Sequence, residues 1–343
     1  MIKIYNLNTG IGSFKLTNIN LEISKGEYFV LLGPTGSGKT ILMESLLGIR
    51  KIDEGSIIKD GRDITSLPIE MRKIGYMPQD YALFPHMNVF NNIAYGLNIK
   101  KVSKKEQDKK VRELAKSLQI EDILHRSING LSGGEKQRVA LGRAIACGLD
   151  IIFLDEPLGA LDENTRNLLC EELRKIHDSF NLTFIHICHN FEEAVNVADR
   201  IAIMNNGTIE QVGTVREIFD TPQSMFVAEF IRTENILEGI ASVVDKTSIV
   251  SVTDTVKIHI KSTFSGSVII SFRPEKVEIG GCMSKNVFNG RIVSVKDRGN
   301  YSSLKIDIGI PVTLHTLDQS LIEGSDISIH IPPDSINVIP KKV

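Results

Sequence analysis

Tryptophan is absent from this chain of 343 residues, and cysteine occurs only four times. The four cysteines are far apart and include no C-x-x-C pair, so the sequence indicates neither a disulfide framework nor a zinc site. No apolar run reaches the roughly 20 residues of a membrane-spanning helix, and no basic-then-apolar leader begins the sequence. We therefore expect a soluble or peripheral protein of a reducing cytosol.

An excess of one sign of charge is also missing. Lysine and arginine together number 40, and aspartate and glutamate number 42. This balance gives no electrostatic reason to expect nucleic acid or an anionic membrane as a direct partner. We expect any contact with a membrane to be made through another protein.

The pattern of apolar residues changes once along the chain. Residues 1–231 alternate short apolar strands with amphipathic segments, which is typical of a parallel sheet covered by helices. From residue 232 onward the helical period disappears, and short runs rich in Val, Ile, Ser and Thr are broken by Gly, Pro and Asp. We therefore predict an α/β domain over 1–231 and a small all-β domain over 232–343.

The second domain contains an internal repeat. Residues 270–277 resemble residues 329–336 in their apolar, proline and acidic positions, and 237–239 resemble 288–290. Two small barrel-like halves are one reading; chance similarity between β-rich segments is the other. In the first domain, Asn206-Gly207 lies between two apolar runs and predicts a β-hairpin.

A glycine-rich segment follows the apolar strand 29–32 and precedes a helical stretch. It fits the pattern G-x-x-x-x-G-K-[ST], whose backbone N–H groups cradle phosphate oxygens at a helix N-terminus. The alternative, a glycine-rich turn without a ligand, is disfavoured by the preceding strand. The predicted nucleotide-binding residues are Gly33, Pro34, Thr35, Gly36, Ser37, Gly38, Lys39 and Thr40.

A second apolar strand, 151–154, ends in two carboxylates, Asp155 and Glu156. Ligands of α/β sheets bind at the carboxyl ends of parallel strands. Asp155 is suited to hold Mg²⁺ and Glu156 to polarise an attacking water as a general base. Solvated acids often end apolar strands, so the pair gains its meaning from the phosphate motif.

About twenty residues before that strand, residues 131–138 read Leu-Ser-Gly-Gly-Glu-Lys-Gln-Arg. With this order of motifs the chain resembles the ATP-binding subunits of ABC (ATP-binding cassette) transporters. The resemblance implies a P-loop NTPase fold with a helical subdomain at about 80–148, ATP and Mg²⁺ as ligands, and a head-to-tail dimer of two copies. It also implies that the signature residues Ser132, Gly133, Gly134 and Glu135 act on ATP held by the partner copy.

Three further positions match the family. The resemblance gives Gln79 a role as a ligand of Mg²⁺ and water, and makes His189 a catalytic residue beside Glu156. Asp162 matches a loop that crosses to the partner. The implied Mg²⁺ ligands are thus Thr40, Gln79 and Asp155. The family's adenine-stacking aromatic aligns with Ile11, a departure for which Phe14 is a candidate substitute.

The all-β tail resembles the OB-like (TOBE) regulatory domain of importer ATPases for oxyanions, sugars, polyamines and iron. Similarity is greatest to subunits that import molybdate, tungstate or sulfate, and the first two are favoured as cargo. The resemblance implies transmembrane permease subunits, an extracytoplasmic oxyanion-binding protein and a place at the cytoplasmic face of the cell membrane. Lys296, Arg298, Ser302 and Ser303 are either an oxyanion site in this tail or a polar hairpin tip.

Two other classes of protein fit the sequence less well than an importer does. A soluble ABC ATPase of DNA repair would separate the halves of the cassette by long coiled coils, and no sustained heptads occur here. A nucleic-acid-binding OB module would need stacking aromatics on a basic face, which the tail does not offer. No nucleic-acid partner is expected.

Overall fold

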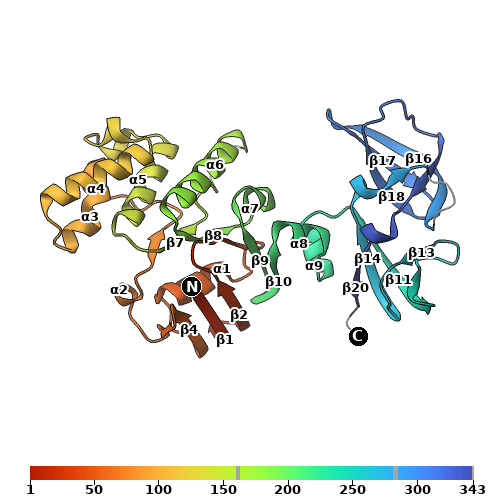
Figure 1. The fold of residues 1–343 in the computed structure, drawn as a ribbon, viewed down its shortest axis with the longest axis horizontal. Coiled ribbons are helices and arrows are strands. Elements are labelled where there is room, and N and C mark those ends of the chain that lie inside the picture. Colours follow the sequence, from red (N-terminus) through yellow and green to blue (C-terminus); the bar gives the residue numbers. More distant parts are fainter. Residues whose placement is uncertain (160–162, 281–284, 342–343) are drawn as a thin grey trace. The chain divides into compact units, whose positions relative to one another are not determined.

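The structure is a computed structural model that describes residues 1–159, 163–280 and 285–341. The chain divides into two compact units, Met1–Val215 and Arg216–Val343. Figure 1 shows the order of the elements in both units.

A six-stranded sheet forms the centre of the first unit. Its strand order is β10-β9-β3-β8-β7-β6, and all neighbours are parallel except β10 and β9. The strands are β3 (Tyr28–Leu32), β6 (Gly75–Met77), β7 (Ile151–Asp155), β8 (Thr183–Cys188), β9 (Arg200–Asn205) and β10 (Thr208–Thr214). Every residue of β3 and β8 is buried, as expected for central parallel strands. The parallel sheet predicted from the apolar strands is thus confirmed.

A second sheet in this unit is antiparallel, which the sequence pattern did not predict. Its order is β2-β1-β4-β5, formed by β1 (Ile2–Ile11), β2 (Phe14–Ile23), β4 (Glu54–Lys59) and β5 (Arg62–Asp63). Strands β1 and β2 are joined by a tight turn, and roughly every second residue is buried. One face of this sheet therefore faces the core, which it shares with helix α1 (Lys39–Leu47) and the central sheet.

Helices form the region between β6 and β7. They are α3 (Val89–Ile99), α4 (Lys104–Ser117) and α5 (Gly133–Ala146), with short 3₁₀ turns at Glu121–Ile123 and Ile128–Gly130. Helices α3 and α4 begin at the side-chain caps Asn88 and Ser103. The basic face of α4 carries (i, i+4) ion pairs such as Lys110–Glu106, so it is a solvated face. Three further helices of this unit are α2 (Ile69–Arg72), α6 (Glu163–Phe180) and α7 (Phe191–Val197).

The predicted hairpin at Asn206-Gly207 is confirmed. Strands β9 and β10 pair antiparallel, and both turn residues have positive φ, 44° for Asn206 and 79° for Gly207. The N–H of Gly207 donates to the carbonyl oxygen of Ser37 at 3.0 Å, and its own carbonyl accepts from Thr17 at 2.9 Å. A β-carbon at Gly207 would lie 1.9 Å from the carbonyl oxygen of Lys15. Glycine is therefore required where this turn closes on the phosphate loop.

The described residues of the second unit form two five-stranded sheets and two short helices. The sheet orders are β13-β12-β11-β14-β20 and β15-β19-β16-β17-β18. The first sheet is made of β11 (Asn235–Val244), β12 (Thr247–Ser251), β13 (Lys257–Ile260), β14 (Gly266–Phe272) and β20 (Asn337–Pro340). The second is made of β15 (Glu278–Ile279), β16 (Val287–Asp297), β17 (Ser302–Asp307), β18 (Pro311–Thr316) and β19 (Asp326–His330). The all-β prediction holds for these sheets, which share one apolar core.

Helices α8 (Val215–Asp220) and α9 (Met225–Phe230) lie at the unit boundary in sequence. The sequence places both before residue 232, in the first domain, but the structure groups residues from Arg216 onward with the second unit. The physical reason lies in contacts of the β-sheets. Arg273 donates to the carbonyl of Phe219, and Ala228 packs with Ile269 and Ile339.

The internal repeat in the second unit is visible in its strand pairing. Leu237 pairs with Ile270 in one half, and Phe288 pairs with Ile329 in the other. These are the corresponding positions of the two repeats. In both halves a 3₁₀ turn follows the second strand of this pair, at Pro274–Lys276 after β14 and at Pro333–Ser335 after β19. The repeat therefore reflects a real internal symmetry.

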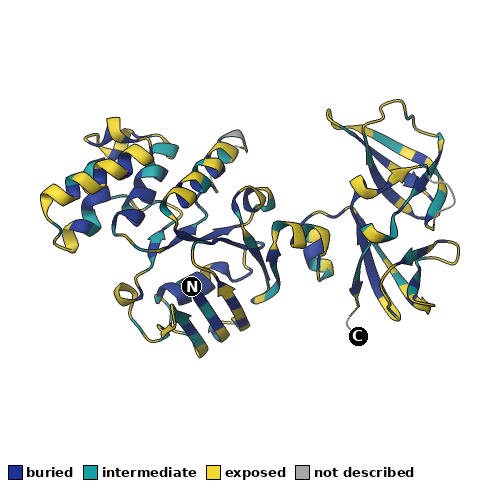
Figure 2. Cartoon of the chain, viewed as in Figure 1, coloured by how far each residue is buried: buried dark blue, intermediate teal, exposed yellow. Residues whose placement is uncertain are grey.

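Reciprocal hydrogen bonds join the two halves. Asn235 exchanges two hydrogen bonds with the backbone of Thr313, at 2.7 and 2.8 Å. The corresponding Asn286 exchanges two with the backbone of His259, at the same distances. Asn235 begins β11 and bonds to the edge strand β18 of the other half. Asn286 directly precedes β16 and bonds to the edge strand β13 of the other half. Both asparagines are buried, so a lost hydrogen bond there would not be replaced by water. Figure 2 shows the buried parts of these strands in dark blue.

Candidate functional site: a phosphate loop beside an acidic strand end

The phosphate loop joins the buried strand β3 to helix α1. Gly36 and Gly38 have φ angles of 81° and 104°, which a side chain would oppose. A β-carbon on Gly33 would lie 2.3 Å from the carbonyl oxygen of Met204. Gly38 caps α1 without a side-chain hydrogen bond, which leaves the N-terminal end of the helix without a competing acceptor. This is the backbone arrangement that binds phosphate.

Lys39 folds back over this loop. Its Nζ donates to the carbonyl oxygens of Gly33 at 2.8 Å and Pro34 at 2.9 Å. The side chain is buried, and desolvation lowers the pKa of Lys39, while the negative charge of Glu156 opposes that shift. The ammonium is thus held at the loop with weak neutral partners, which an anionic phosphate would replace favourably.

The acidic strand end lies beside this loop. Asp155 ends β7, and its Oδ2 accepts a hydrogen bond from the hydroxyl of Tyr76 at 3.1 Å. Burial raises the pKa of Asp155, and the Tyr76 hydrogen bond partly offsets the rise. A half-buried carboxylate with so few donors is suited to a cation.

Glu156 is the meeting point of three segments. Nε2 of Gln79 donates to Oε2 of Glu156 at 3.3 Å, and Nδ1 of His189 lies 3.5 Å from its Oε1. Gln79 follows β6 and His189 follows β8, so both neighbours of β7 contribute a side chain at the same sheet edge. The structure thus brings together three of the residues selected from the sequence.

Backbone strain marks the same position. Glu156 has a φ of 43°, in the left-handed region that residues with a side chain rarely adopt. Its N–H donates to Ile187 of β8 at 3.0 Å, which helps hold this conformation. Strained backbone of this kind is common at functional sites, where it directs a side chain.

The signature segment forms a self-contained helix start. Ser132 caps α5 with a complete capping box, in which its Oγ accepts from the N–H of Glu135 at 3.3 Å and the Glu135 carboxylate accepts from the N–H of Ser132 at 2.7 Å. The latter bond, with a second from the Ser132 hydroxyl, lowers the pKa of Glu135. Gly133 and Gly134 leave the first turn free of bulk. Among the described residues, no hydrogen bond or ion pair joins Ser132 or Glu135 to the phosphate loop.

The β1–β2 hairpin carries Ile11 and Phe14, the two positions considered from the sequence for adenine stacking. Ile11 pairs with Phe14 at the end of the β1–β2 hairpin, and Ile11 is exposed. The Phe14 ring lies against Gly38 of the phosphate loop, where a β-carbon would meet it at 3.1 Å. Phe14 is therefore placed near the loop. Asp162 lies outside the described residues.

Sequence reasoning missed a link between α5 and the loop after Gln79. Arg143 of α5 donates to the carbonyl oxygens of Tyr81 and Ala82, both at 2.6 Å, and lies 5.1 Å from the centre of the Phe84 ring. Tyr81 and Ala82 have positive φ, so this loop depends on such anchors. The signature helix is thereby tied to the Gln79 loop. The segment 81–87 is only partly exposed, because Phe84 also packs on Tyr95.

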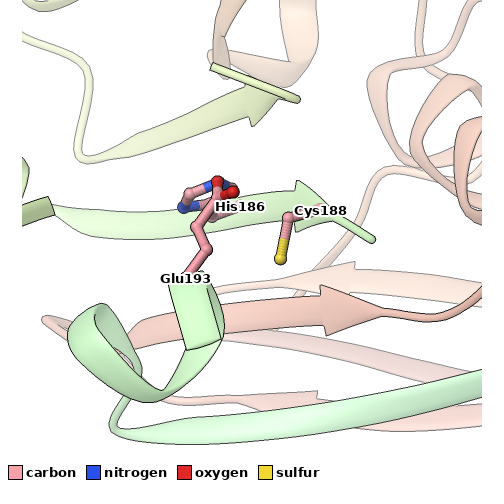
Figure 3. A group of neighbouring side chains, drawn as sticks. All are labelled: His186, Cys188 and Glu193. Atoms are coloured by element: carbon pink, nitrogen blue, oxygen red, sulfur yellow. The ribbon is translucent and has the colours of Figure 1, made fainter. Parts of the chain in front are cut away.

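A buried polar chain beneath His189 was also missed. The hydroxyl of Tyr28 lies 3.0 Å from Nδ1 of His186, whose Nε2 lies 2.8 Å from Oε1 of Glu193. Figure 3 shows His186 and Glu193 side by side, with Cys188 on the same strand. The three elements that it joins are β3, which leads to the phosphate loop, β8, which leads to His189, and α7. All three groups are buried, which makes this chain a rigid connection between the two loops.

His186, Cys188 and Glu193 also place three potential metal-ligand atoms within 4.8 Å of one another. Burial raises the pKa of the Cys188 thiol well above its usual range, and His186 and Glu193 already satisfy each other. A neutral thiol and a paired imidazole are poor metal ligands. We interpret the cluster as a structural network.

Comparisons with known proteins agree with this geometry. Residues 16–159 match the family model described as "ABC transporter". A molybdate/tungstate import ATP-binding protein of Pyrococcus horikoshii is 40% identical over 99% of this chain and 100% of that protein. A sulfate/thiosulfate import ATP-binding protein of Bacillus cereus is 45% identical over 69% of this chain and 68% of that protein.

Two solved structures share the fold of the first unit. A dimeric ATP-binding cassette in a post-hydrolysis state with ADP and phosphate has a TM-score of 0.55 and 29% identity, covering 63% of this chain and 99% of that one. The cbiO1 protein of Clostridium perfringens, part of an ABC transporter complex, has a TM-score of 0.60 and 27% identity, covering 64% and 90%. No helix among the described residues is long and apolar enough to cross a membrane. From the site, the fold and these relatives, the chain belongs to the ATP-binding, ATP-hydrolysing subunits of the ABC transporter family.

Proposed function

We propose that this chain is the motor subunit of an importer for molybdate or tungstate, with Glu156 as the general base of ATP hydrolysis. The observation that carries the catalytic part is the convergence of Gln79 and His189 on Glu156, at distances of 3.3 and 3.5 Å, beside the phosphate loop. Each residue comes from a different strand end of one sheet. This edge is where α/β sheets bind ligands.

The phosphates of ATP would be held by residues 33–40. Glycines at positions 33, 36 and 38 keep the loop backbone open, and Lys39 is already aimed at its interior. Lys39 would exchange two carbonyl partners for phosphate oxygens. Thr40 follows on the exposed side of the helix start.

Mg²⁺ would be held by the hydroxyl of Thr40, the amide oxygen of Gln79 and the carboxylate of Asp155. All three donors are oxygens, which this cation prefers, and the half-buried Asp155 has only Tyr76 as a hydrogen-bond donor among the described residues. When bound, the ion neutralises charge on the phosphate oxygens.

Glu156 would accept the proton of the attacking water through Oε1 or Oε2. Its strained backbone directs the carboxylate toward Gln79 and His189, and these two side chains limit its rotation. His189 is exposed at this edge, so its Nε2 is available for the terminal phosphate. Positioning of this kind, more than covalent chemistry, is what phosphoryl transfer requires.

A second copy of the chain would complete the site. Ser132, Gly133, Gly134 and Glu135 have no link to the phosphate loop of their own chain among the described residues, as expected if they act on ATP in the partner. Asp162 is proposed for the same interface from its sequence position. The pair would act at the cytoplasmic face of the membrane, beneath permease subunits supplied with cargo by an extracytoplasmic binding protein.

The cargo is proposed from relatives that match nearly the whole chain. The two Pyrococcus proteins named for molybdate/tungstate import cover 99% and 98% of it. Sulfate/thiosulfate is the second candidate, supported by the 45% identity of the Bacillus cereus protein over a shorter length. Polyamine import is the third, because a spermidine/putrescine protein matches 95% of the chain at 37% identity.

Cargo uptake in cells tests the proposal. The resident gene is replaced by the Lys39→Ala form, and uptake of labelled molybdate, tungstate, sulfate and spermidine is measured. Loss of molybdate or tungstate uptake alone would support the proposed cargo, and loss of sulfate or spermidine uptake would move the assignment to those substrates. Unchanged uptake of all four, with intact ATPase activity of the wild-type protein, would favour an ABC ATPase that is not coupled to these permeases.

A further inference from the structure

A cavity of about 630 Å³ lies within the second unit. The two 3₁₀ turns of the internal repeat, Pro274–Lys276 and Pro333–Ser335, contribute to its wall, as does the segment 219–222. Its volume falls in the range of about 300–1,000 Å³ that is typical of small-molecule sites. The cavity is therefore formed where the two halves of the repeat meet.

Arg273 is the buried charge of this cavity. Its Nε and one terminal nitrogen donate to the carbonyl oxygen of Phe219 at 3.3 and 3.0 Å, and its guanidinium lies 3.4 Å from the centre of the Phe219 ring. These contacts fix the plane of the guanidinium. They engage Nε and one of the two terminal nitrogens, and leave the other terminal nitrogen without a hydrogen-bond partner among the described residues.

An ion pair for Arg273 is also missing from the described part of the chain. Desolvation lowers the pKa of Arg273, and the negative charges of Glu275 and Asp220 oppose that shift, although neither carboxylate forms an ion pair with Arg273. The free end of a fixed guanidinium matches a carboxylate or phosphate group, which can accept two parallel hydrogen bonds.

A second buried group in the wall is unpartnered. Thr233 is 8% exposed, and its hydroxyl has no hydrogen-bond partner in the described structure. Buried hydroxyls are normally bonded, and because this oxygen is itself closed to solvent, a rotation about χ1 of Thr233 is needed to turn the hydroxyl toward a ligand in the cavity. It can donate to an anion or accept from a ligand hydroxyl.

The carboxylates of the wall are mostly engaged. Asp220 pairs with Arg216, Asp334 with Lys261, and Glu278 with His330. Glu275 and Lys276 are both exposed and have no ion pair among the described residues, so their opposite charges are screened by solvent. The buried guanidinium of Arg273 therefore makes the interior of the cavity favour an anionic group.

We propose that this cavity binds a small organic anion whose carboxylate or phosphate group is held by the guanidinium of Arg273 and the hydroxyl of Thr233. The rest of the ligand would fill the space between the two repeat turns, where Phe264 and Phe272 supply apolar wall. The cavity is larger than an inorganic tetrahedral ion needs. It is distinct from the loop of Lys296 and Arg298, and the proposal does not depend on the transported cargo.

Isothermal titration of the full-length protein tests this site. The protein is first saturated with ADP and Mg²⁺, so that the phosphate loop does not bind the probes. The probes are citrate, glycerol 3-phosphate, sulfate and molybdate at millimolar concentrations. Citrate and glycerol 3-phosphate separate a carboxylate from a phosphate source of the same interaction.

Three variants locate the binding. Arg273→Gln is expected to weaken binding of the organic probe at least about tenfold, since a charge-assisted bidentate contact is lost. Thr233→Val is expected to weaken it about fivefold. The hydroxyl of Thr233 makes no hydrogen bond within the described structure, so this variant should fold even if Arg273→Gln does not. Arg298→Gln is the matched control and should bind as the wild type does.

Binding of citrate or glycerol 3-phosphate with this pattern of losses would support the site. The proposal is overturned if neither organic probe binds, if only sulfate or molybdate binds, or if Thr233→Val and every folded Arg273 variant bind as tightly as the wild type. Losses confined to Arg298→Gln would place an anion site on the β16–β17 hairpin instead.

Discussion

Nδ1 of His189 lies 3.5 Å from Oε1 of Glu156, although the two residues follow different strands of the sheet. The parallel pairing of β7 with β8 brings them together, because Asp155 is level with Ile187. The buried chain from Tyr28 through His186 to Glu193 then supports the segment that carries His189. The proposed catalytic geometry thus rests on polar contacts in the core.

Asp155→Asn is predicted to stabilise the protein in the absence of nucleotide and metal. Burial raises the folded-state pKa of Asp155 above its unfolded value, so the ionised carboxylate destabilises the fold at neutral pH. Asparagine can keep the Tyr76 hydrogen bond without the charge. The gain in stability should be largest above the folded-state pKa of Asp155 and should disappear as the pH falls below its unfolded-state pKa. Thermal unfolding in EDTA measures it. A series from pH 3 to 8 spans the ordinary carboxyl pKa of about 4. A variant less stable than the wild type at neutral pH would contradict this.

Glu193→Ala is predicted to lower the free energy of unfolding by about 1–3 kcal/mol, because it leaves Nε2 of His186 buried without a partner. His186→Phe removes the same contact but leaves the carboxylate of Glu193 without its partner. Urea unfolding of both single variants and the double variant gives the coupling between them. Strictly additive losses would show that the contact has no energetic role.

Arg143→Met is predicted to slow ATP hydrolysis about tenfold with a small change in stability. The variant keeps most of the aliphatic packing but loses both hydrogen bonds to the Tyr81 and Ala82 carbonyls, and so frees the loop that carries Gln79. Arg112→Met, on the exposed face of α4, is the control. Steady-state ATPase rates equal in both variants would contradict a positioning role for Arg143.

Asn235→Ala and Asn286→Ala are each predicted to destabilise the second unit by about 2–4 kcal/mol. Each variant leaves a backbone N–H and C=O of the opposite half without its partner. The exposed Asn289→Ala serves as the control. Chemical unfolding of the full chain, followed by a probe in the second unit, would show equal stability for all three if the reciprocal bonds were unimportant.

The motifs of the site were predictable from the sequence because they are local. The phosphate loop, the acidic strand end and the signature residues that begin at Ser132 each lie within a short segment. The register of the repeat was predictable for the same reason, since Leu237 and Phe288 lie at matching positions.

Long-range contacts were not predictable in this way. Nothing local marks Arg143 as the donor to the Tyr81 and Ala82 carbonyls, or Tyr28 as a partner of His186. The antiparallel sheet of β1, β2, β4 and β5 depends on the return of the chain after α1. The only sequence signal for it was the alternation of apolar and polar residues, which the burial pattern of β1 follows. The grouping of Phe219 with the second unit depends on Arg273, which is distant in sequence.

The most direct test of the central claim measures ATP binding and ATP hydrolysis on the same preparations of wild type, Glu156→Gln and the exposed control Glu113→Gln. Glutamine preserves the size of Glu156 but cannot accept the proton of water, so hydrolysis should fall by about 10²–10⁴-fold while ATP still binds. The control should match the wild type. Hydrolysis by Glu156→Gln within a few-fold of the wild-type rate would contradict the assignment of Glu156 as the general base.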